Sequence, residues 1–473
     1  MSTEMEERRI NTGENRLGVL PVGQLIRQFA VPSIIAMLVG ALYNIVDQFF
    51  IGRNIGELGN AATNVAFPLT TFCVALALLF GIGGASSFNL ALGRKQKEQA
   101  VYYMGNAAVL LFLTGTILCV VTQLFLTPML RFFGAPDSVL GYAVTYTKIT
   151  SIGFPFLIYS NGGAHLVRAD GTPKYSMVCN LTGALINTVL DPLFIFGFGM
   201  GMAGAALATI IGQIVAAGMI FCYMLRCKTV TLKKNHLILR AEYFVPVMSL
   251  GMSSFFNQIA MMIVQIVLNN SLTYYGARSV YGESVPLACA GIISKVAMLY
   301  FSVVIGLAQG LQPIAGYNYG AEKYDRVKQV YFQTVRYALT VSGAAFLLFQ
   351  LIPRQIISVF GDGSEEYFLF AVRYFRIFLF ATFLNGIQPV TATFFTAIGK
   401  PVKGIFLSLT RQILFLLPLI VIFPLFMGID GIMYAGPIAD LAAGAAAVLM
   451  ISLEMRQITG LQKGGEKGAA EFG

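Results

Sequence analysis

Two aspartates stand inside apolar runs, where a carboxylate has little access to water. Asp47 lies in ALYNIVDQFFIG and Asp191 lies in LINTVLDPLFIFG. A charge at the centre of a bilayer costs about 2.5–3.5 kcal/mol on insertion scales, so both residues are candidates for function. Removal from water favours the neutral form of a carboxyl group. A proton produces that form, and a bound cation balances the negative charge instead. For Asp47 the alternative is a carboxylate close to Arg53 that reaches water at the helix end.

Asp191 has polar neighbours at helical spacing. Asn187 lies four residues earlier and therefore on the same helix face. Pro192 cannot donate to the helix ladder, which leaves a carbonyl free one turn earlier. Thr209 follows in the next apolar run, after a glycine-rich loop. The oxygens of Asp191, Asn187 and Thr209 suit a proton or a Na⁺ ion, and the alternative is an interhelical hydrogen-bond clamp.

The second half of the chain carries intramembrane charges of both signs. Asp440, Lys295 and Arg411 lie in three separate apolar runs. These residues either pair with one another or line a water-filled cavity, and the sequence favours neither alternative. We expect the following residues to line a substrate cavity: Tyr43, Asn44, Asn161, Gln258, Lys295, Gln309, Arg411 and Asp440.

The composition requires a membrane. Of the 473 residues, 56% are hydrophobic and only 11% are charged, whereas a soluble domain carries about 25% charged residues. This excludes a cytosolic enzyme and a nucleic-acid-binding protein, despite the net charge of +10. The sequence shows no Walker A motif and no Ser-His-Asp arrangement, so we expect a protein that is not an enzyme.

Twelve apolar runs are long enough to cross a bilayer, and in lipid such runs form helices. The predicted fold is therefore all-α and integral to the membrane. The predicted spans are residues 25–51, 61–92, 102–130, 140–166, 174–198, 204–226, 243–275, 285–316, 328–352, 368–397, 401–426 and 430–455.

Lys and Arg concentrate in alternate loops, which places both termini in the cytoplasm. The longest basic stretch, residues 227–242, follows six spans and precedes six more. The predicted organisation is a cytoplasmic N-terminal segment (1–24), an N-lobe (25–226), a cytoplasmic linker (227–242), a C-lobe (243–455) and a cytoplasmic tail (456–473).

The two halves form an internal repeat. Gly93 matches Gly320, Gly171 matches Gly399, and GMAGAALAT at 201–209 matches GIDGIMYAG at 428–436. Each half has an even number of predicted spans, so the repeat is parallel and its axis lies along the membrane normal. Such a repeat predicts a substrate site at the interface of the halves, near the midplane.

Several segments resemble multidrug and toxic compound extrusion (MATE) transporters, over nearly the whole chain. The Asn-x-x-x-Asp-Pro element is similar to that of the DinF-like branch, which includes MepA-like exporters. The segments that carry the resemblance are IVDQFFIGR (45–53), LGRKQKEQA (92–100), RADGTPKYSMVCN (168–180), INTVLDPLFIFGFGMGMAGAALAT (186–209), GLAQGLQPIAGYNYGA (306–321) and GIQPVTATFFTAIGKP (386–401).

The resemblance implies the MATE fold, with twelve transmembrane helices in two pseudo-symmetric six-helix lobes. It implies export of hydrophobic organic cations by alternating access, against H⁺ or Na⁺ and with no other cofactor. It also implies a monomer in the inner (plasma) membrane of a bacterium. The ion-coupling site that it implies consists of Asp47, Asn187, Asp191, Thr209, Tyr146 and the backbone carbonyl of Ala205.

Three other functions compete with multidrug antiport. A flippase for lipid-linked molecules or other metabolites belongs to the same superfamily, although it usually has a strongly cationic cavity. A channel has no need of paired acids and a proline hinge. An integral-membrane enzyme would show His, Asp or Ser clusters at the membrane interface.

Overall fold

The computed structural model describes residues 15–282, 284–359 and 365–471, and over these ranges the chain is helical without a strand. The predicted N-terminal segment and tail therefore lie partly outside the described residues, at 1–14 and 472–473. Within the described ranges, eleven helices are long and apolar enough to cross a membrane. The predicted all-α membrane fold is confirmed.

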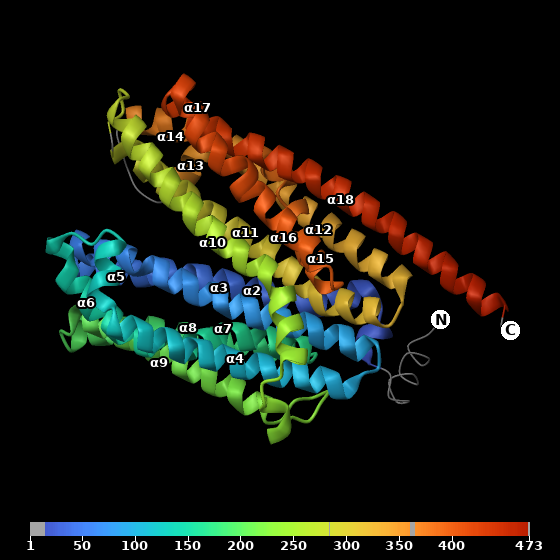
Figure 1. Ribbon diagram of the computed structural model, residues 1–473. Coiled ribbons are helices and arrows are strands. Elements are labelled where there is room, and N and C mark those ends of the chain that lie inside the picture. The colour runs from blue at the N-terminus through green and yellow to red at the C-terminus, as the bar shows by residue number, and fades with distance from the viewer. Residues whose placement is uncertain (1–14, 283, 360–364, 472–473) are drawn as a thin grey trace. The chain divides into compact units, whose positions relative to one another are not determined.

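The helices pack into two separate units. The N-unit is Arg27–Ile259, and the C-unit combines the described residues of 1–26 with those of 260–473. Figure 1 shows the helices in chain order from blue to red. The N-unit contains most of α2 (Val22–Ile55), α3 (Glu57–Gly93), α4 (Lys97–Leu124), α5 (Leu126–Phe132), α6 (Asp137–Ile152), α7 (Phe154–Ala169), α8 (Pro173–Pro192), η2 (Leu193–Gly197), α9 (Gly201–Met224), η3 (Lys234–Leu237) and the start of α10 (Ala241–Ala277).

The C-unit begins with a short turn and continues after the middle of α10. Its helix α18 runs without a break from Ile429 to Glu471, past residue 455 where the last span was predicted to end. The elements are η1 (Arg16–Gly18), α11 (Ser284–Gly320), α12 (Tyr324–Leu351), α13 (Pro353–Ser358), α14 (Glu365–Phe378), η4 (Phe380–Leu384), α15 (Ile387–Ala397), α16 (Pro401–Leu409), η5 (Thr410–Leu416), α17 (Leu417–Met427) and α18.

The fourth predicted span is two helices rather than one. Helices α6 and α7 have 16 residues each and meet at Gly153, so neither alone reaches the roughly 20 residues needed to cross the hydrocarbon core. Pro155 in the first turn of α7 has no N–H to continue the ladder of α6. The tenth predicted span is interrupted in the same way, by η4 between α14 and α15.

The backbone repeats at the anchors that the sequence repeat predicts. Gly171 and Gly399 have φ of +85° and +80°, and Lys95 and Glu322, just after Gly93 and Gly320, have φ of +61° and +56°. The third anchor pair, at residues 201 and 428, has φ of +55° and +59°. Positive φ is uncommon outside glycine, so its recurrence at all three matched places indicates that the halves share one backbone plan.

The segment before α2 is held in the C-unit. Asn318 at the end of α11 donates from Nδ2 to the Leu17 carbonyl at 2.9 Å. Arg326 in α12 donates from Nη2 to the Leu20 carbonyl at 2.6 Å. The boundary between the units therefore falls inside α2, after Ile26.

The end of the linker is held in the N-unit by an equivalent arrangement. Asn106 on α4 donates to the Ile238 carbonyl at 3.2 Å and accepts the Arg240 backbone N–H at 3.0 Å. Tyr102, one turn earlier on α4, stacks on Tyr243 with ring centroids 4.5 Å apart. The linker therefore packs with the N-unit, and the second boundary between the two compact units lies inside α10, after Ile259.

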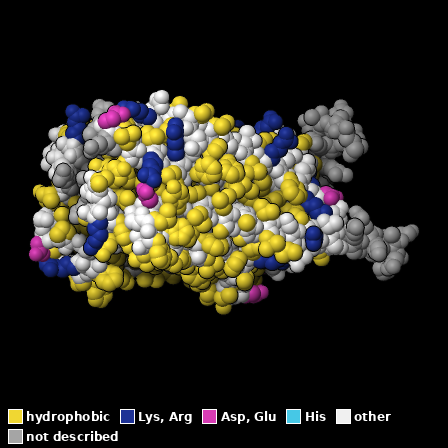
Figure 2. Space-filling view, turned by 90° about the horizontal axis from the view of Figure 1, so that it is seen from above, with side chains coloured by type: hydrophobic (Ala, Val, Ile, Leu, Met, Phe, Trp, Pro, Cys, Tyr) yellow, Lys and Arg dark blue, Asp and Glu magenta, His cyan; other side chains and the backbone are white. Residues whose placement is uncertain are grey.

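The surface fits a protein in lipid. Figure 2 shows hydrophobic side chains over the middle of the face in view, with Lys and Arg gathered nearer its two ends. Many large apolar side chains on the spanning helices are exposed, for example Leu185 at 66% and Leu449 at 64%. A soluble protein rarely exposes apolar patches of that extent, so the lipid is the partner of this surface.

Candidate functional site

Two acidic side chains of the N-unit face each other. Asp47 lies on α2 and Asp191 lies at the end of α8, and their carboxyl groups are within hydrogen-bonding range. Asp191 is fully buried and Asp47 is half-buried. Oδ1 of Asp47 has no hydrogen-bond partner, and within the described chain neither acid forms an ion pair with a basic side chain.

Asn187 joins this pair to helix α9. Its Nδ2 lies 3.4 Å from Asp191 Oδ1 and 3.2 Å from Thr209 Oγ1. The Thr209 hydroxyl donates to the Ala205 carbonyl at 3.0 Å. Turning the amide by half a rotation places its nitrogen 3.2 Å from Asp191 Oδ2 and its oxygen 3.2 Å from Thr209 Oγ1. In either orientation one amide connects the acid on α8 with the hydroxyl on α9.

Two glycines allow α8 and α9 to approach this closely. A Cβ on Gly212 would lie 2.5 Å from the Gly183 carbonyl oxygen and 3.4 Å from Cβ of Asn187. A Cβ on Gly183 would lie 3.0 Å from the Gly212 carbonyl. Small residues are the usual means of close helix packing in membranes, and here they place Asn187 beside Thr209.

Two tyrosines complete the polar group. Tyr43 lies one turn before Asp47 on α2, and Tyr146 lies on α6. Both phenols are close enough to Asp47 and Asp191 to interact with the charge of each carboxylate. The structure therefore brings together all six residues predicted for ion coupling, from helices α2, α6, α8 and α9.

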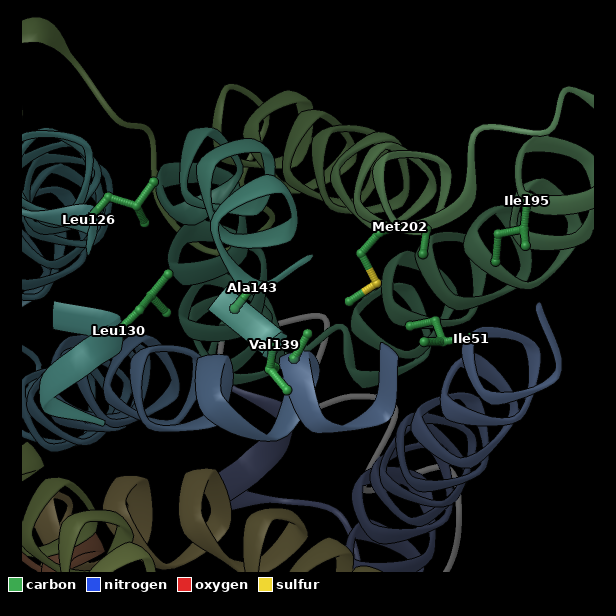
Figure 3. Close-up of a cluster of buried hydrophobic side chains, with 9 residues drawn as sticks. Ile51, Leu126, Leu130, Val139, Ala143, Ile195 and Met202 are labelled. Carbon is green, nitrogen blue, oxygen red and sulfur yellow. The ribbon is translucent and has the colours of Figure 1, made fainter. Parts of the chain in front are cut away.

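An apolar cluster adjoins one side of the carboxyl pair. Ile51 lies on α2, one turn after Asp47. Ile195 lies on η2, one turn after Asp191. The side chains of both isoleucines are fully buried. Figure 3 shows Ile51 and Met202 close together in this cluster. The buried members are Ile51, Ala62, Leu126, Leu130, Val139, Ala143, Ile195, Met202 and Ala205, and Tyr146 packs against them. This packing excludes water from that side of the acids.

The backbone next to Asp191 departs from the α-helix. Pro192 ends α8, and residues 193–197 form a π-helical turn. A π-turn changes the hydrogen-bond pattern and is frequent at functional sites. The equivalent span of the C-unit also contains one, η5, which includes Arg411.

The charged residues of the second half are only partly brought together. Arg411 Nε donates to Asp440 Oδ1 at 2.6 Å, which is the pairing alternative raised by the sequence. Lys295 is exposed on α11 and forms no ion pair with the described residues. Charge pairing in this unit therefore involves Arg411 and Asp440 without Lys295.

The other predicted cavity residues have separate surroundings. Asn44 and Asn161 are exposed and donate to carbonyls of their own helices, Gly40 at 2.7 Å and Leu157 at 2.9 Å. Gln258 is half-buried on α10 of the N-unit, and Gln309 is buried on α11 of the C-unit. The two asparagines therefore bond within their own helices, which is the packing role that polar residues commonly have in membrane helices.

Two polar residues were not anticipated. Asn385, just after η4, donates to Asp440 Oδ2 at 2.8 Å, and no spacing in the sequence pointed to it. Asp170 is buried after α7 and accepts the backbone N–H groups of Lys228 and Thr229 at 2.6 and 3.0 Å. Burial raises the pKa of Asp170 above its usual range. The sequence signal that could have pointed to this contact is the acidic residue Asp170 itself, in the loop RADGTP.

The arrangement suits a monovalent ion or a proton. In the described part of the chain no three His, Cys, Asp or Glu side chains gather as a transition-metal site would require. The candidate ligands for Na⁺ are the oxygens of Asp191, Asn187 and Thr209 with the Ala205 carbonyl, all hard donors. The site is buried, oxygen-rich and short of positive charge.

Repeated halves of spanning helices, with a carboxyl pair inside one of them, define a polytopic membrane transporter rather than an enzyme. The MatE family model matches residues 32–193 and 253–422. The chain belongs to this family, the MATE transporters.

Similar proteins cover nearly the same length. The multidrug export protein MepA of Staphylococcus saprophyticus is 24% identical over 432 residues, which are 91% of this chain and 94% of that protein. MepA of Staphylococcus aureus strain MSSA476 is 25% identical over 448 residues, 93% and 95% of the two chains.

Solved structures share the fold. An outward-facing multidrug resistance MATE family transporter of the MOP superfamily has a TM-score of 0.87 at 22% identity, covering 94% of this chain and 98% of that one. A MOP superfamily transporter from Pyrococcus furiosus, whose binding pocket is described as having reversed polarity, has a TM-score of 0.87 at 21% identity, with coverage of 94% and 98%.

Proposed function

We propose that this chain is a multidrug exporter that moves hydrophobic organic cations outward in exchange for H⁺ or Na⁺. The observation that carries the proposal is the carboxyl pair of Asp47 and Asp191, which has no basic partner in the described chain. Two such groups in a dry site cannot both stay ionised, so the site has to take up a proton or a cation. Its relatives named multidrug export protein support the direction and the substrate class.

The site supports either coupling ion. One proton taken up by the carboxyl groups of Asp47 and Asp191 would remove the repulsion between two neighbouring negative charges. The oxygens of Asn187 and Thr209 and the Ala205 carbonyl provide the further ligands that Na⁺ prefers. Na⁺ would replace that proton and use both carboxylates.

Coupling follows if the ion and the drug bind different conformations with different affinity. Neutralising Asp47 and Asp191 changes the charge on the facing ends of α2 and α8, next to the proline and π-turn after Asp191. Losing the ion restores a negative site that favours the next organic cation. A membrane potential of 100 mV adds about 2.3 kcal/mol for each charge moved.

We further propose that the protein is a monomer in the inner (plasma) membrane of a bacterium, with both termini in the cytoplasm. The basic linker and the basic loops at 94–97 and 323–328 support this orientation. The bacterial source of the MepA relatives supports the location.

The test is transport by the purified protein in proteoliposomes. Ethidium movement is measured with an imposed pH gradient, an imposed Na⁺ gradient, both or neither, and with an ionophore that collapses each gradient. We expect one gradient to drive ethidium, with loss of transport when the ionophore is added. Ethidium movement that ignores every gradient would overturn antiport, and transfer of a fluorescent phospholipid instead of ethidium would favour the flippase.

A further inference from the structure

Three sulfur atoms of the N-unit meet where helix α9 ends and the linker begins. Met104 lies on α4, Met224 is the last residue of α9, and Cys227 is the first residue of the linker. The Cys227 Sγ lies 3.7 Å from Met104 Sδ and 4.0 Å from Met224 Sδ. Because Met104 and Cys227 are 123 residues apart in the chain, it is the packing of α4 against the linker that brings them together.

The fold directs Cys227 back towards the end of α9. The Arg226 N–H donates to the Tyr223 carbonyl at 2.8 Å, so the chain turns as soon as the helix ends. The carboxylate of Asp170 accepts the two backbone N–H groups that follow Cys227 in the chain, at 2.6 and 3.0 Å. The thiol is therefore positioned from both sides and does not move freely with the linker.

This sulfur cluster has more electron-pair donors than protons. Besides the two thioether sulfurs, the Met224 carbonyl oxygen lies 3.4 Å from Cys227 Sγ. The thiol has a single proton and can donate it to only one of these three acceptors at a time. Met104 and Met224 are buried and Cys227 is half-buried, so water has little access to the remaining electron pairs. A bound cation would use them.

The nearest charged group is negative. Burial, and after it the charge of Asp170, raise the pKa of the Cys227 thiol to about 12. Among the described residues Asp170 forms no ion pair with a basic side chain. The same negative charge that opposes a free thiolate attracts a cation, and a metal ion removes the proton of the thiol that binds it.

The spacing of the sulfurs fits one metal ion. Two sulfur ligands about 2.3 Å from a shared metal lie about 3.8 Å apart at a tetrahedral angle and about 4.0 Å apart at a trigonal angle. The separations from Cys227 Sγ, 3.7 and 4.0 Å, match these values without a change of backbone. Zn²⁺ prefers thiolate, imidazole and carboxylate ligands, whereas thioethers with a thiolate suit a soft ion such as Cu⁺.

We propose that Met104, Met224 and Cys227 form a binding site for a soft monovalent cation, Cu⁺ or Ag⁺, with Asp170 as a positioning residue. One thiolate balances one positive charge, so the three ligands and the ion are neutral together, as a buried place requires. The bound ion would join α4, α9 and the start of the linker at one point. This site is separate from the carboxyl pair of Asp47 and Asp191 and does not depend on the proposed export function.

The test is transfer of Cu⁺ to the purified, full-length protein from its complex with bathocuproine disulfonate, without oxygen and with ascorbate present. Loss of the colour of the complex counts the ions transferred, and competition with the chelator keeps single thiols from contributing. X-ray absorption at the copper edge gives the number of sulfur neighbours. The rate of tryptic cleavage after Lys228, the residue next to Cys227, reports on the linker.

Three variants separate a sulfur cluster from a lone thiol. Met104→Leu combined with Met224→Leu keeps the thiol and nearly the same side-chain volume but removes both thioethers. Cys227→Ser removes the thiol. Cys222→Ser is the matched control, because Cys222 is an exposed free cysteine at the end of the same helix. The melting temperature of each metal-free variant checks that it is folded.

We expect wild type to take up one Cu⁺ with three sulfur neighbours at about 2.3 Å, and tryptic cleavage after Lys228 to slow severalfold. The double methionine variant should bind Cu⁺ about tenfold more weakly or worse, Cys227→Ser should not bind it, and Cys222→Ser should behave as wild type. Equal Cu⁺ binding by wild type and the double methionine variant would overturn the site, because a lone thiol would then suffice. Displacement of Cu⁺ by an equal amount of Zn²⁺ would also overturn it.

Discussion

The carboxyl groups of Asp47 and Asp191 meet across helices α2 and α8 without a basic side chain beside them in the described chain. A buried acid of the other unit, Asp440, accepts a hydrogen bond from Arg411 at 2.6 Å. The two halves share a backbone plan but differ in this one respect. We therefore propose that ion exchange takes place in the N-unit, where charge compensation has to come from outside the protein.

Asp191→Asn is expected to reduce gradient-driven ethidium transport by about tenfold or more, because the amide cannot release or accept the coupling ion. Asp137→Asn is the control in the same unit, since Asp137 is 88% exposed and pairs with Arg131 at the surface. Initial rates in proteoliposomes, at equal amounts of inserted protein, check this expectation. Native gradient-driven rates in Asp191→Asn would remove Asp191 from the coupling site.

Thr209→Val is expected to lower both transport and thermal stability. The substitution removes the hydroxyl that connects Asn187 with the Ala205 carbonyl, and a buried polar group left without its partner costs about 1–3 kcal/mol. Thr209→Ser keeps the hydroxyl and should stay close to wild type. The melting temperature of each purified variant in detergent and its transport rate in proteoliposomes distinguish Thr209→Val from Thr209→Ser. Equal melting temperatures and transport rates of the two variants would show that the hydroxyl is not needed.

Gly212→Ala is expected to separate α8 from α9 and to impair transport. The added Cβ would lie 2.5 Å from the Gly183 carbonyl oxygen, which is a backbone atom that cannot move alone. Gly218→Ala on the same helix meets no atom within 4 Å and should be neutral or stabilise by about 0.5–1 kcal/mol. Equal transport by the two alanine variants would show that close contact of α8 and α9 is unimportant for the site.

Asn106→Leu is expected to release the end of the linker from α4. Asn106 holds the backbone at Ile238 and Arg240, and trypsin has nearby targets at Lys233 and Lys234. Cleavage within 227–242 should accelerate by severalfold in native detergent solution, as measured by mass spectrometry of the fragments. Asn235→Leu, in the same linker, is the comparison; unchanged cleavage in Asn106→Leu would mean that other contacts hold the segment.

Local rules of helix spacing predicted much of the carboxyl site. The four-residue step from Asn187 to Asp191 and the short glycine-rich loop before the span of Thr209 were enough to place these groups on adjacent helices, whereas Tyr146 and Ala205 followed only from the resemblance to MATE transporters. The pairing of Arg411 with Asp440 rather than Lys295 depends on how α11, η5 and α18 pack, which periodicity does not encode. The break at Gly153 was missed because both pieces are apolar and read as one continuous span.

Asn385 and the unit boundaries lay beyond sequence reasoning for another reason. Asn385 acts through a residue on α18, distant along the chain, and no charge or spacing marked it. The linker at 227–242 is a break in composition, whereas the two compact units divide inside α2 and α10, and Asn106 and Arg326 hold segments near these helices to distant parts of the chain. Both the role of Asn385 and the packing of the segments near the unit boundaries involve hydrogen bonds between residues that are distant along the chain.

The docking of the first described residues has a consequence for how the chain is made. Leu17 is bound by Asn318, and Leu20 is bound by Arg326, so these contacts cannot form until more than half of the polypeptide has left the ribosome. Until then the beginning of α2, with Leu25 and Ile26 that end up almost fully buried, lacks the C-unit contacts of the segment before it. Docking of the segment before the first transmembrane helix is thus a late event in biogenesis, although this segment is among the first to be synthesised.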